Sequence, residues 1–143
     1  MEEMPKIGIN ATFTHDEPTG LGVYTFELVK EILRQGDGNI IVYTPSKMLK
    51  DIAPERVRLT NSYLCPDRRF KGHLFRLLWE QTSLPIRLIK DRISLLHSTV
   101  PEGVLNPFIP QIITFQDILP VRYPEMYPRM KYNFYYIIPI LTK

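Results

Sequence analysis

The sequence predicts an α/β fold, a Rossmann-like parallel sheet with helices on both faces. Short apolar segments alternate with helical patterns along most of the 143 residues, and such alternation favours parallel strands joined by crossover helices. A glycine-containing turn, Gly20-Leu21-Gly22, connects the first apolar segment to the first helical pattern. With 44% hydrophobic and 23% charged residues, the composition is that of an ordinary globular domain. We expect a single domain that spans residues 1–143.

The predicted strands are short apolar runs bounded by proline, glycine or polar residues. β-Branched and aromatic side chains favour extended segments of this kind. Five segments share these features: 6–10, 39–44, 57–63, 93–97 and 111–115. The last of them, QIITF, has the clearest pattern. The first of them, 6–10, is expected to be a buried strand.

The first predicted helix follows from the spacing of its apolar residues. Gly22, Phe26, Val29 and Leu33 recur every three or four positions, so they share one helix face. The glycines in the segment 36–38 are expected to end this helix, because glycine is favoured just past a helix C-terminus.

Proline and capping residues define the later helices. Ser46 is suited to cap a short helix that Pro54 stops. Residues 67–90 form the longest helical pattern, which Pro85 is expected to kink or split. A last helix is predicted over 129–141, after a proline-rich loop.

Charge and cysteine content narrow the class of protein. Eighteen basic residues against 15 acidic ones give a net charge of +3, too small and too dispersed to indicate a nucleic-acid partner. The single cysteine, Cys65, excludes an internal disulfide, and residues 1–6 do not resemble a signal peptide, so the cytoplasm is expected. The sequence contains no run of about 18 apolar residues, so no membrane span is predicted.

One stretch of the longest helical pattern is locally basic. A solvated helix face is the commoner explanation for such a stretch, and peripheral contact with an anionic membrane is the alternative. Its basic residues are Arg68, Arg69, Lys71, His73 and Arg76, around the apolar residues Phe70, Leu74 and Phe75.

Glycines follow the first predicted strand, at the end where parallel sheets bind ligands. Gly20 and Gly22 allow close approach of the backbone, and N–H groups at a helix N-terminus favour an anion such as a phosphate. The alternative explanation for these two glycines is a tight turn that needs positive φ. Thr25 stands where a dinucleotide fingerprint has its third glycine, so a nicotinamide-dependent enzyme is disfavoured.

Polar residues follow the last predicted strand. Asp117 can accept hydrogen bonds from a sugar hydroxyl or, alternatively, from its own loop backbone in an Asx turn. Gln116 is uncharged, so it can bind and orient a ligand but cannot act as a general base. His97 and Tyr24 are weaker binding candidates. No residue is a certain catalyst, and the histidines and the cysteine lack metal-ligand spacing, so no metal or other cofactor is expected.

Three stretches of the sequence carry recognisable motifs. In chain order they are 19–25 (TGLGVYT) with Glu27-Leu28, 78–81 (LWEQ) followed by Leu84-Pro85, and 112–120 (IITFQDILP) with Tyr123-Pro124-Glu125. Together they resemble the N-terminal half of a family 4 glycosyltransferase of the GT-B fold. The first resembles the glycine-rich turn and first helix of this family, and the second is common in its mannosyltransferase-like members. The third resembles a strand and loop that usually read T-x-H-D-L-x-P.

The resemblance implies retaining transfer of a hexose, with mannose suggested by the second stretch, from a nucleotide sugar to a glycan or lipid-linked acceptor. In such enzymes the N-terminal half mainly holds the acceptor, while its glycine turn, here Gly20 and Gly22, approaches the donor phosphates. The C-terminal half holds most of the nucleotide sugar with basic residues and a pair of glutamates. Metal is generally not needed.

Two departures from the family pattern modify these expectations. Gln116 stands where the family has a histidine, so it can hydrogen-bond the transferred sugar but cannot be protonated. The C-terminal nucleotide-sugar domain is absent from the 143 residues, although another chain is a candidate source for it. Since most groups that stabilise phosphate charge would belong to that half, we expect the chain alone not to transfer sugar. The alternatives are a non-catalytic α/β binding module that pairs with a separate chain, and a nucleotide-binding oxidoreductase fragment.

Overall fold

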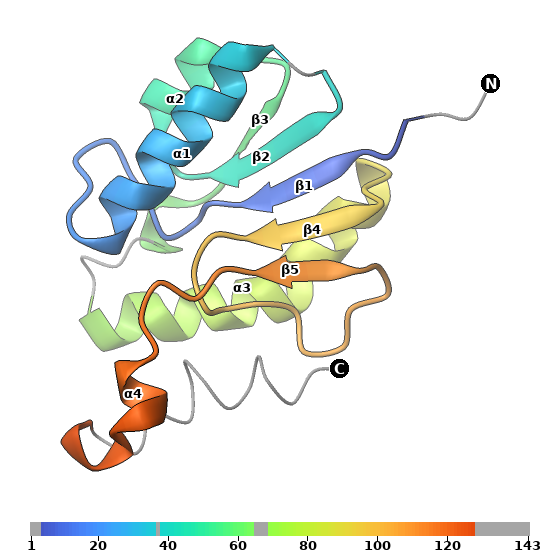
Figure 1. Ribbon diagram of the computed structural model, residues 1–143. Helices are drawn as coiled ribbons and strands as arrows, with labels where there is room; N and C mark the ends of the chain where they lie inside the picture. The colour runs from blue at the N-terminus through green and yellow to red at the C-terminus, as the bar shows by residue number, and fades with distance from the viewer. Residues whose placement is uncertain (1–3, 37, 65–68, 128–143) are drawn as a thin grey trace.

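The computed structural model describes residues 4–36, 38–64 and 69–127, and its centre is a five-stranded parallel sheet (Figure 1). The strand order is β3-β2-β1-β4-β5, and every neighbouring pair is parallel. This arrangement confirms the predicted Rossmann-like α/β fold. The strands are β1 (Ile7–Asn10), β2 (Ile40–Thr44), β3 (Val57–Leu59), β4 (Leu95–Ser98) and β5 (Gln111–Ile113).

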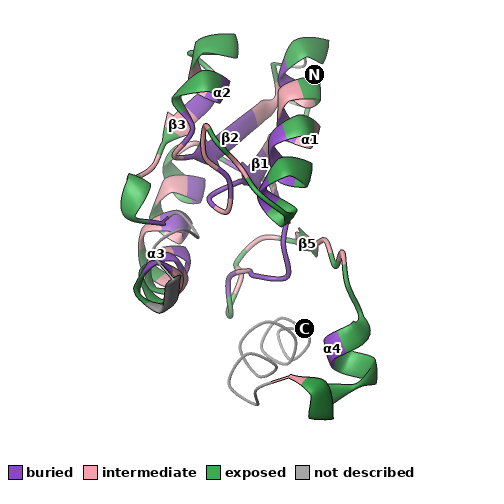
Figure 2. Cartoon of the chain, turned by 90° about the vertical axis from the view of Figure 1, so that its left-hand side faces the viewer, coloured by how far each residue is buried: buried purple, intermediate pink, exposed green. Residues whose placement is uncertain are grey.

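Helices cover both faces of the sheet, as the sequence predicts. Helices α1 and α2 pack on one face, and α3 packs on the other (Figure 1). The strands are mostly buried, whereas the outer sides of these helices are exposed (Figure 2). The helices are α1 (Leu21–Gln35), α2 (Lys47–Ile52), α3 (Arg69–Lys90) and α4 (Leu119–Arg122), with short 3-10 turns η1 (Ser62–Leu64) and η3 (Pro124–Met126).

Alternation along the strands divides the core into two clusters, because successive side chains point to opposite faces of a sheet. Ile9 and Val42 pack with the apolar side chains of α1 and α2. Ile41, Tyr43 and Leu96 pack with those of α3 on the other face. A Cβ at Gly8 would lie 3.0 Å from Ile93 Cγ2 and 3.2 Å from Leu88 Cδ2, so the lack of a side chain there lets the end of α3 and the turn after it pack closely on β1.

The end of α1 agrees with its predicted stop signal. Gly36 follows the helix with a φ of 80°, in the left-handed region that glycine adopts without strain.

Three elements differ from the sequence-based expectation. Pro85 does not split the long helix: α3 runs through it, because Leu84 and Leu88 on either side are fully buried against the sheet and packing outweighs one lost backbone hydrogen bond. The third strand ends at Leu59 and is followed by η1. The proline-rich loop contains α4 and η3, which were not predicted. The helix expected over 129–141 lies outside the described residues.

The loop after β1 is fastened to the start of α2. Asp16 Oδ1 accepts hydrogen bonds from Ser46 Oγ at 2.5 Å and from the Met48 N–H at 3.0 Å. Ser46 Oγ also caps α2, as predicted, by accepting from the Leu49 N–H at 3.2 Å. The loop and the helix therefore share one polar anchor.

Replacing Ser46 with alanine should lower the free energy of unfolding by about 1–2 kcal/mol, since it removes a helix cap and one hydrogen bond to Asp16. Urea denaturation followed by circular dichroism measures the change. Ser94→Ala, at an exposed serine between α3 and β4, is the control. Equal stability of the two variants would contradict the anchoring role.

Within the described ranges, none of the helices combines the length and the apolar character needed to cross a bilayer.

Candidate functional site

The candidate site lies at the carboxyl ends of β1 and β4, where the order of the strands reverses. The chain leaves β1 for β2 on one side and later crosses from β3 to β4 on the other side. Open α/β sheets bind ligands at this kind of switch point. The loops that begin there are 11–20 after β1, 99–110 after β4 and 114–118 after β5.

The glycine turn lies at this edge, at the start of α1. Gly20 has a φ of 54°, and a Cβ added to it would have no atom within 4 Å, so the space beside it is open. The N–H groups of Gly22 and Val23 already donate inside the turn, to Thr19 O and Gly20 O. In the part of the chain that the structure describes, the N–H of Leu21 makes no hydrogen bond, so it is the donor left for a ligand.

Gly22 has a packing role that Gly20 lacks. It is buried, and a Cβ there would lie 3.2 Å from Pro18 Cβ and 3.5 Å from Phe13 O. Thr14 Oγ1 donates to Gly22 O at 2.8 Å. The second glycine therefore lets the loop after β1 fold back on α1.

Gln116 is connected to the start of α1 through threonines. Its Nε2 donates to Thr99 O, and Thr25 Oγ1 on α1 donates to Thr99 Oγ1 at 3.1 Å. Thr99 Oγ1 in turn donates to Asn10 O at the end of β1. Within the described residues, Gln116 Oε1 is buried and has no hydrogen-bond partner, so one acceptor at this edge is left unsatisfied.

The other predicted residues lie around this edge in separate environments. Asp117 is exposed, and its Oδ1 accepts from the Leu119 N–H at 2.8 Å, which is the Asx turn considered as its alternative role. His97 is half-buried with its Nε2 2.8 Å from Thr114 Oγ1, and burial lowers the pKa of its imidazole. Tyr24 is exposed in the first turn of α1.

A buried ion pair lies beneath this edge. Arg76 on α3 donates from Nε and Nη2 to the two carboxylate oxygens of Glu102, at 2.6 and 2.7 Å. Arg76 is 1% exposed and Glu102 is equally buried, so the expectation of a solvated basic face is wrong for this residue. His73, expected at the surface, is half-buried with Nδ1 3.0 Å from Arg76 Nη2 and 3.3 Å from Glu102 Oε1.

A second buried carboxyl group, Glu80, lies one helical turn from Arg76. Asn10 Nδ2 at the end of β1 donates to Glu80 Oε1 at 2.8 Å. Glu80 Oε2 and the hydroxyl of Ser98, which pairs in register with Asn10, are buried without hydrogen-bond partners in the described ranges. We call Asn10, His73, Arg76, Glu80 and Glu102 the buried polar cluster.

One carboxyl group of the buried polar cluster, that of Glu80, is held in its neutral form. Burial raises the pKa of Glu80 well above its usual value, and the nearby Glu102 carboxylate raises it further. Burial alone would also raise the pKa of Glu102, but the charge and hydrogen bonds of Arg76, with help from His73, lower it to about 2. Because the two pKa values are shifted in opposite directions, Glu80 is neutral and lies beside an ionised Arg76–Glu102 pair.

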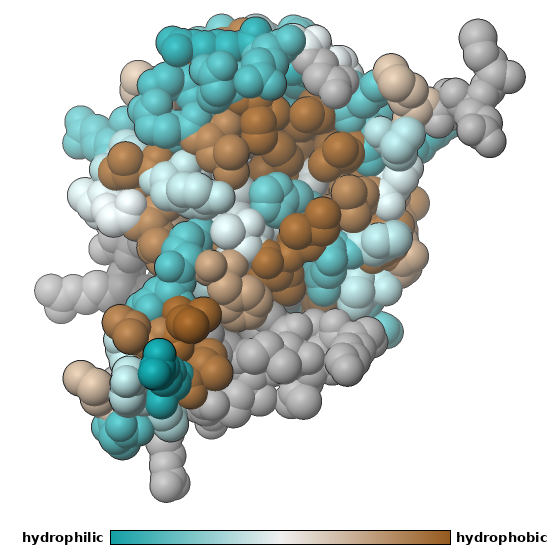
Figure 3. All heavy atoms as spheres, viewed as in Figure 1, coloured by the Kyte–Doolittle hydropathy of each residue, from teal (hydrophilic) through white to brown (hydrophobic). Residues whose placement is uncertain are grey.

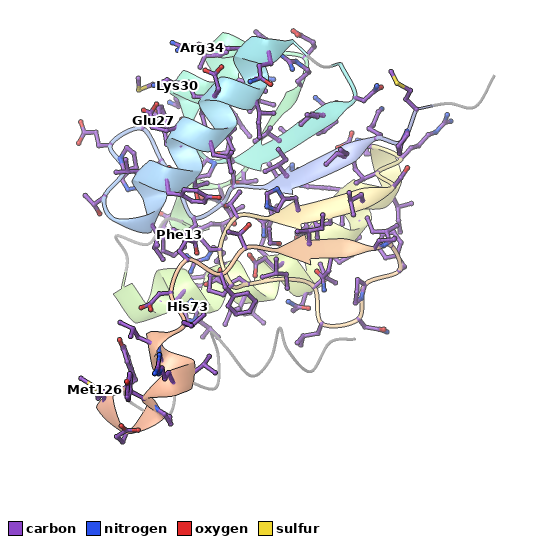
Figure 4. All side chains as sticks on the ribbon, viewed as in Figure 1. Phe13, Glu27, Lys30, Arg34, His73 and Met126 are labelled. Atoms are coloured by element: carbon purple, nitrogen blue, oxygen red, sulfur yellow. The ribbon has the colours of Figure 1, made fainter. Side chains whose placement is uncertain are left out.

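The buried polar cluster holds the loops that border the candidate site. The Arg76 guanidinium lies 4.9 Å from the centre of the Phe13 ring, in the loop after β1. Figure 4 labels Phe13 in that loop and His73 on α3. Asn10 Oδ1 accepts from both the N–H and the hydroxyl of Thr12, and Glu102 belongs to the loop after β4.

The residues of the buried polar cluster were not among those that the sequence motifs predict for the site. His73, Arg76 and Glu80 are spaced by three and four positions, so they share a helix face, and that spacing was the available signal. No local pattern marks Glu102, which follows Pro101 in a loop. In the described ranges, no three histidine, cysteine, aspartate or glutamate side chains gather in a way that could hold a metal ion.

Comparison with protein-family models, curated proteins and solved structures gave no significant match. The fold defines the class: an α/β, Rossmann-like arrangement with a five-stranded parallel sheet.

Proposed function

We propose that this chain is the acceptor-side half of a family 4 glycosyltransferase that transfers a hexose from a nucleotide sugar to a glycan or lipid-linked acceptor in the cytoplasm. The supporting observation is that the glycine turn and Gln116 lie at the same edge of a parallel sheet and are linked through Thr25 and Thr99. Both belong to the stretches that resemble the family.

The free polar groups at this edge suit binding rather than proton transfer. The N–H of Leu21 at the start of the 15-residue helix α1, beside the open space at Gly20, can donate to a phosphate oxygen. Gln116 Oε1 can accept from a sugar hydroxyl. Neither group is charged. Most of the charge that stabilises a leaving nucleoside diphosphate would therefore come from a second domain.

Titration with uridine or guanosine diphosphate, followed by amide NMR, tests this proposal. We expect the 143-residue chain to bind weakly, with the largest shifts at Leu21 and Gln116, and not to transfer sugar from the corresponding nucleotide sugars. Gly20→Ala should weaken the binding several-fold, because a side chain at a φ of 54° strains the turn and fills the open space.

Gly36→Ala provides a matched control at the other end of α1. Gly36 also has positive φ and open space around its Cβ position, so the two variants carry similar backbone strain. Binding that both variants weaken equally, shifts centred elsewhere, or no shift at millimolar nucleotide would contradict the proposal.

A non-catalytic binding module that pairs with a separate chain is the second candidate. The segment around α4 favours it, because Ile118, Leu119 and Met126 expose at least half of their surface. Figure 3 shows apolar surface in the region of α4, on the lower left. Stable co-purification with one protein that is not a glycosyltransferase domain would favour this candidate.

A further inference from the structure

The outer face of α3 carries an unusual row of exposed apolar side chains. Leu74, Phe75, Leu78, Ile86 and Ile89 recur at helical spacing and are all exposed, with Ile86 at 67% and Ile89 at 64%. We call these five residues the α3 stripe. The opposite side of the same helix packs on the sheet through Leu84 and Leu88, so the α3 stripe is not part of the core. Figure 2 shows the exposed outer side of α3 in green.

A neighbouring loop widens this apolar surface. Gln81 on α3 donates from Nε2 to Gly103 O and accepts at Oε1 from the Leu105 N–H, both at 2.8 Å. These two bonds fasten the loop after β4 alongside α3, and the side chain of Leu105 is 45% exposed.

The charges on this face have one sign. Lys71 and Lys90 are exposed at the two ends of the α3 stripe, about 28 Å apart along a helix that rises 1.5 Å per residue. Glu80 is the sole acidic residue of α3 and is fully buried. The exposed face of α3 therefore presents apolar side chains framed by cations and carries no acidic group.

We propose that α3 is a membrane-docking face, on which the α3 stripe enters the headgroup region of an anionic bilayer while Lys71 and Lys90 contact acidic lipid headgroups. Helices that lie in the membrane interface combine exposed apolar residues with lysine or arginine in this manner. The proposal does not depend on the function proposed above.

A second copy of the chain fits this face less well. In a symmetric antiparallel pair of α3 helices, Lys71 of one copy would lie near Lys90 of the other. Two like charges would then meet at each end of the interface, whereas an anionic surface compensates both lysines.

Vesicle sedimentation with the full chain tests the docking face. We expect binding to vesicles of phosphatidylcholine with one third phosphatidylglycerol, and little binding to pure phosphatidylcholine. The double variant Lys71→Gln/Lys90→Gln should bind about 30-fold more weakly, since each lysine near an anionic surface contributes about 1 kcal/mol. Ile86→Ser/Ile89→Ser should also weaken binding strongly, because it removes the two most exposed apolar side chains of the stripe.

Two further pairs are matched controls on other elements. Arg34→Gln/Lys47→Gln removes two exposed cations from α1 and α2, and Ile118→Ser/Met126→Ser removes two exposed apolar side chains around α4. All four pairs change exposed positions, and circular dichroism checks their folding. Three results would overturn the proposal: no binding to anionic vesicles, equal loss in test and control pairs, or a dimer in solution that Ile86→Ser/Ile89→Ser dissociates.

Discussion

Replacing Arg76 with methionine should lower the free energy of unfolding by about 3–5 kcal/mol, the cost of leaving a buried charge without its partner. Methionine keeps most of the side-chain volume but removes both hydrogen bonds to Glu102, the bond to Leu64 O and the contact with the Phe13 ring. Glu102 would then remain fully buried without its cation. Since domains are stable by roughly 5–15 kcal/mol, the loss is a large part of the total and is measurable by urea denaturation.

Arg87→Met on the same helix is the control for this prediction. Arg87 is less buried, lies 5.9 Å from the Trp79 ring and donates to Leu59 O at 3.5 Å, so we expect its loss to cost less than about 1 kcal/mol. Adding Glu102→Gln to Arg76→Met should recover part of the stability, because a neutral amide replaces the uncompensated carboxylate. Similar stability of the two single variants would show that the Arg76–Glu102 pair does not hold the fold.

Much of the fold was predictable because local and tertiary signals agree. The first strand is a short apolar run, and α1 combines a regular apolar face with Gly36 at its end, so propensity, periodicity and capping indicate the same element. The anchor of α2 was predictable for the same reason, since Ser46 precedes a short amphipathic segment that Pro54 ends. Pro85 does not break α3 as its local effect predicts, because the packing of its neighbours outweighs that effect and is a tertiary property.

The candidate site was predictable only in its position. Parallel strands bring their carboxyl ends together, so the loops with Gly20 and Gln116 were expected at one edge, and they lie there. The buried polar cluster joins β1, α3 and the loop after β4. No local pattern in a single sequence indicates that these three segments come into contact. The burial of Arg76 and Glu80 depends on Glu102 and Asn10, which are more than 20 residues away along the chain.

Replacing Glu80 with glutamine should make the protein more stable at neutral pH than the unchanged chain, although it alters a fully buried residue. Because burial and the Glu102 carboxylate raise the pKa of Glu80 in the folded state, the unfolded chain loses this proton near its usual pKa of 4.5 while the folded chain keeps it. Above pH 4.5 the folded state therefore binds more protons than the unfolded state. The free energy of unfolding of the protein then falls by about 1.4 kcal/mol per pH unit as long as the folded state keeps the proton. Glutamine is neutral at every pH and can still accept the Asn10 hydrogen bond through Oε1.

Urea denaturation of both proteins between pH 4 and pH 8 measures this effect. We expect equal stabilities near pH 4, a growing advantage of Glu80→Gln above pH 4.5, and a constant difference once the pH exceeds the folded-state pKa of Glu80.

Glu102→Gln is the matched substitution, and we expect the opposite effect on stability. The folded-state pKa of Glu102 is about 2, so its charge stabilises the fold above pH 4.5 by roughly 3 kcal/mol. This stabilisation is lost as the pH falls toward 2. The same change of glutamate to glutamine should therefore stabilise the protein at one position and destabilise it at the other, which a merely steric role of the two side chains would not produce. Destabilisation by Glu80→Gln at pH 7 would mean that Glu80 is ionised in the folded protein and pairs with Arg76 alongside Glu102.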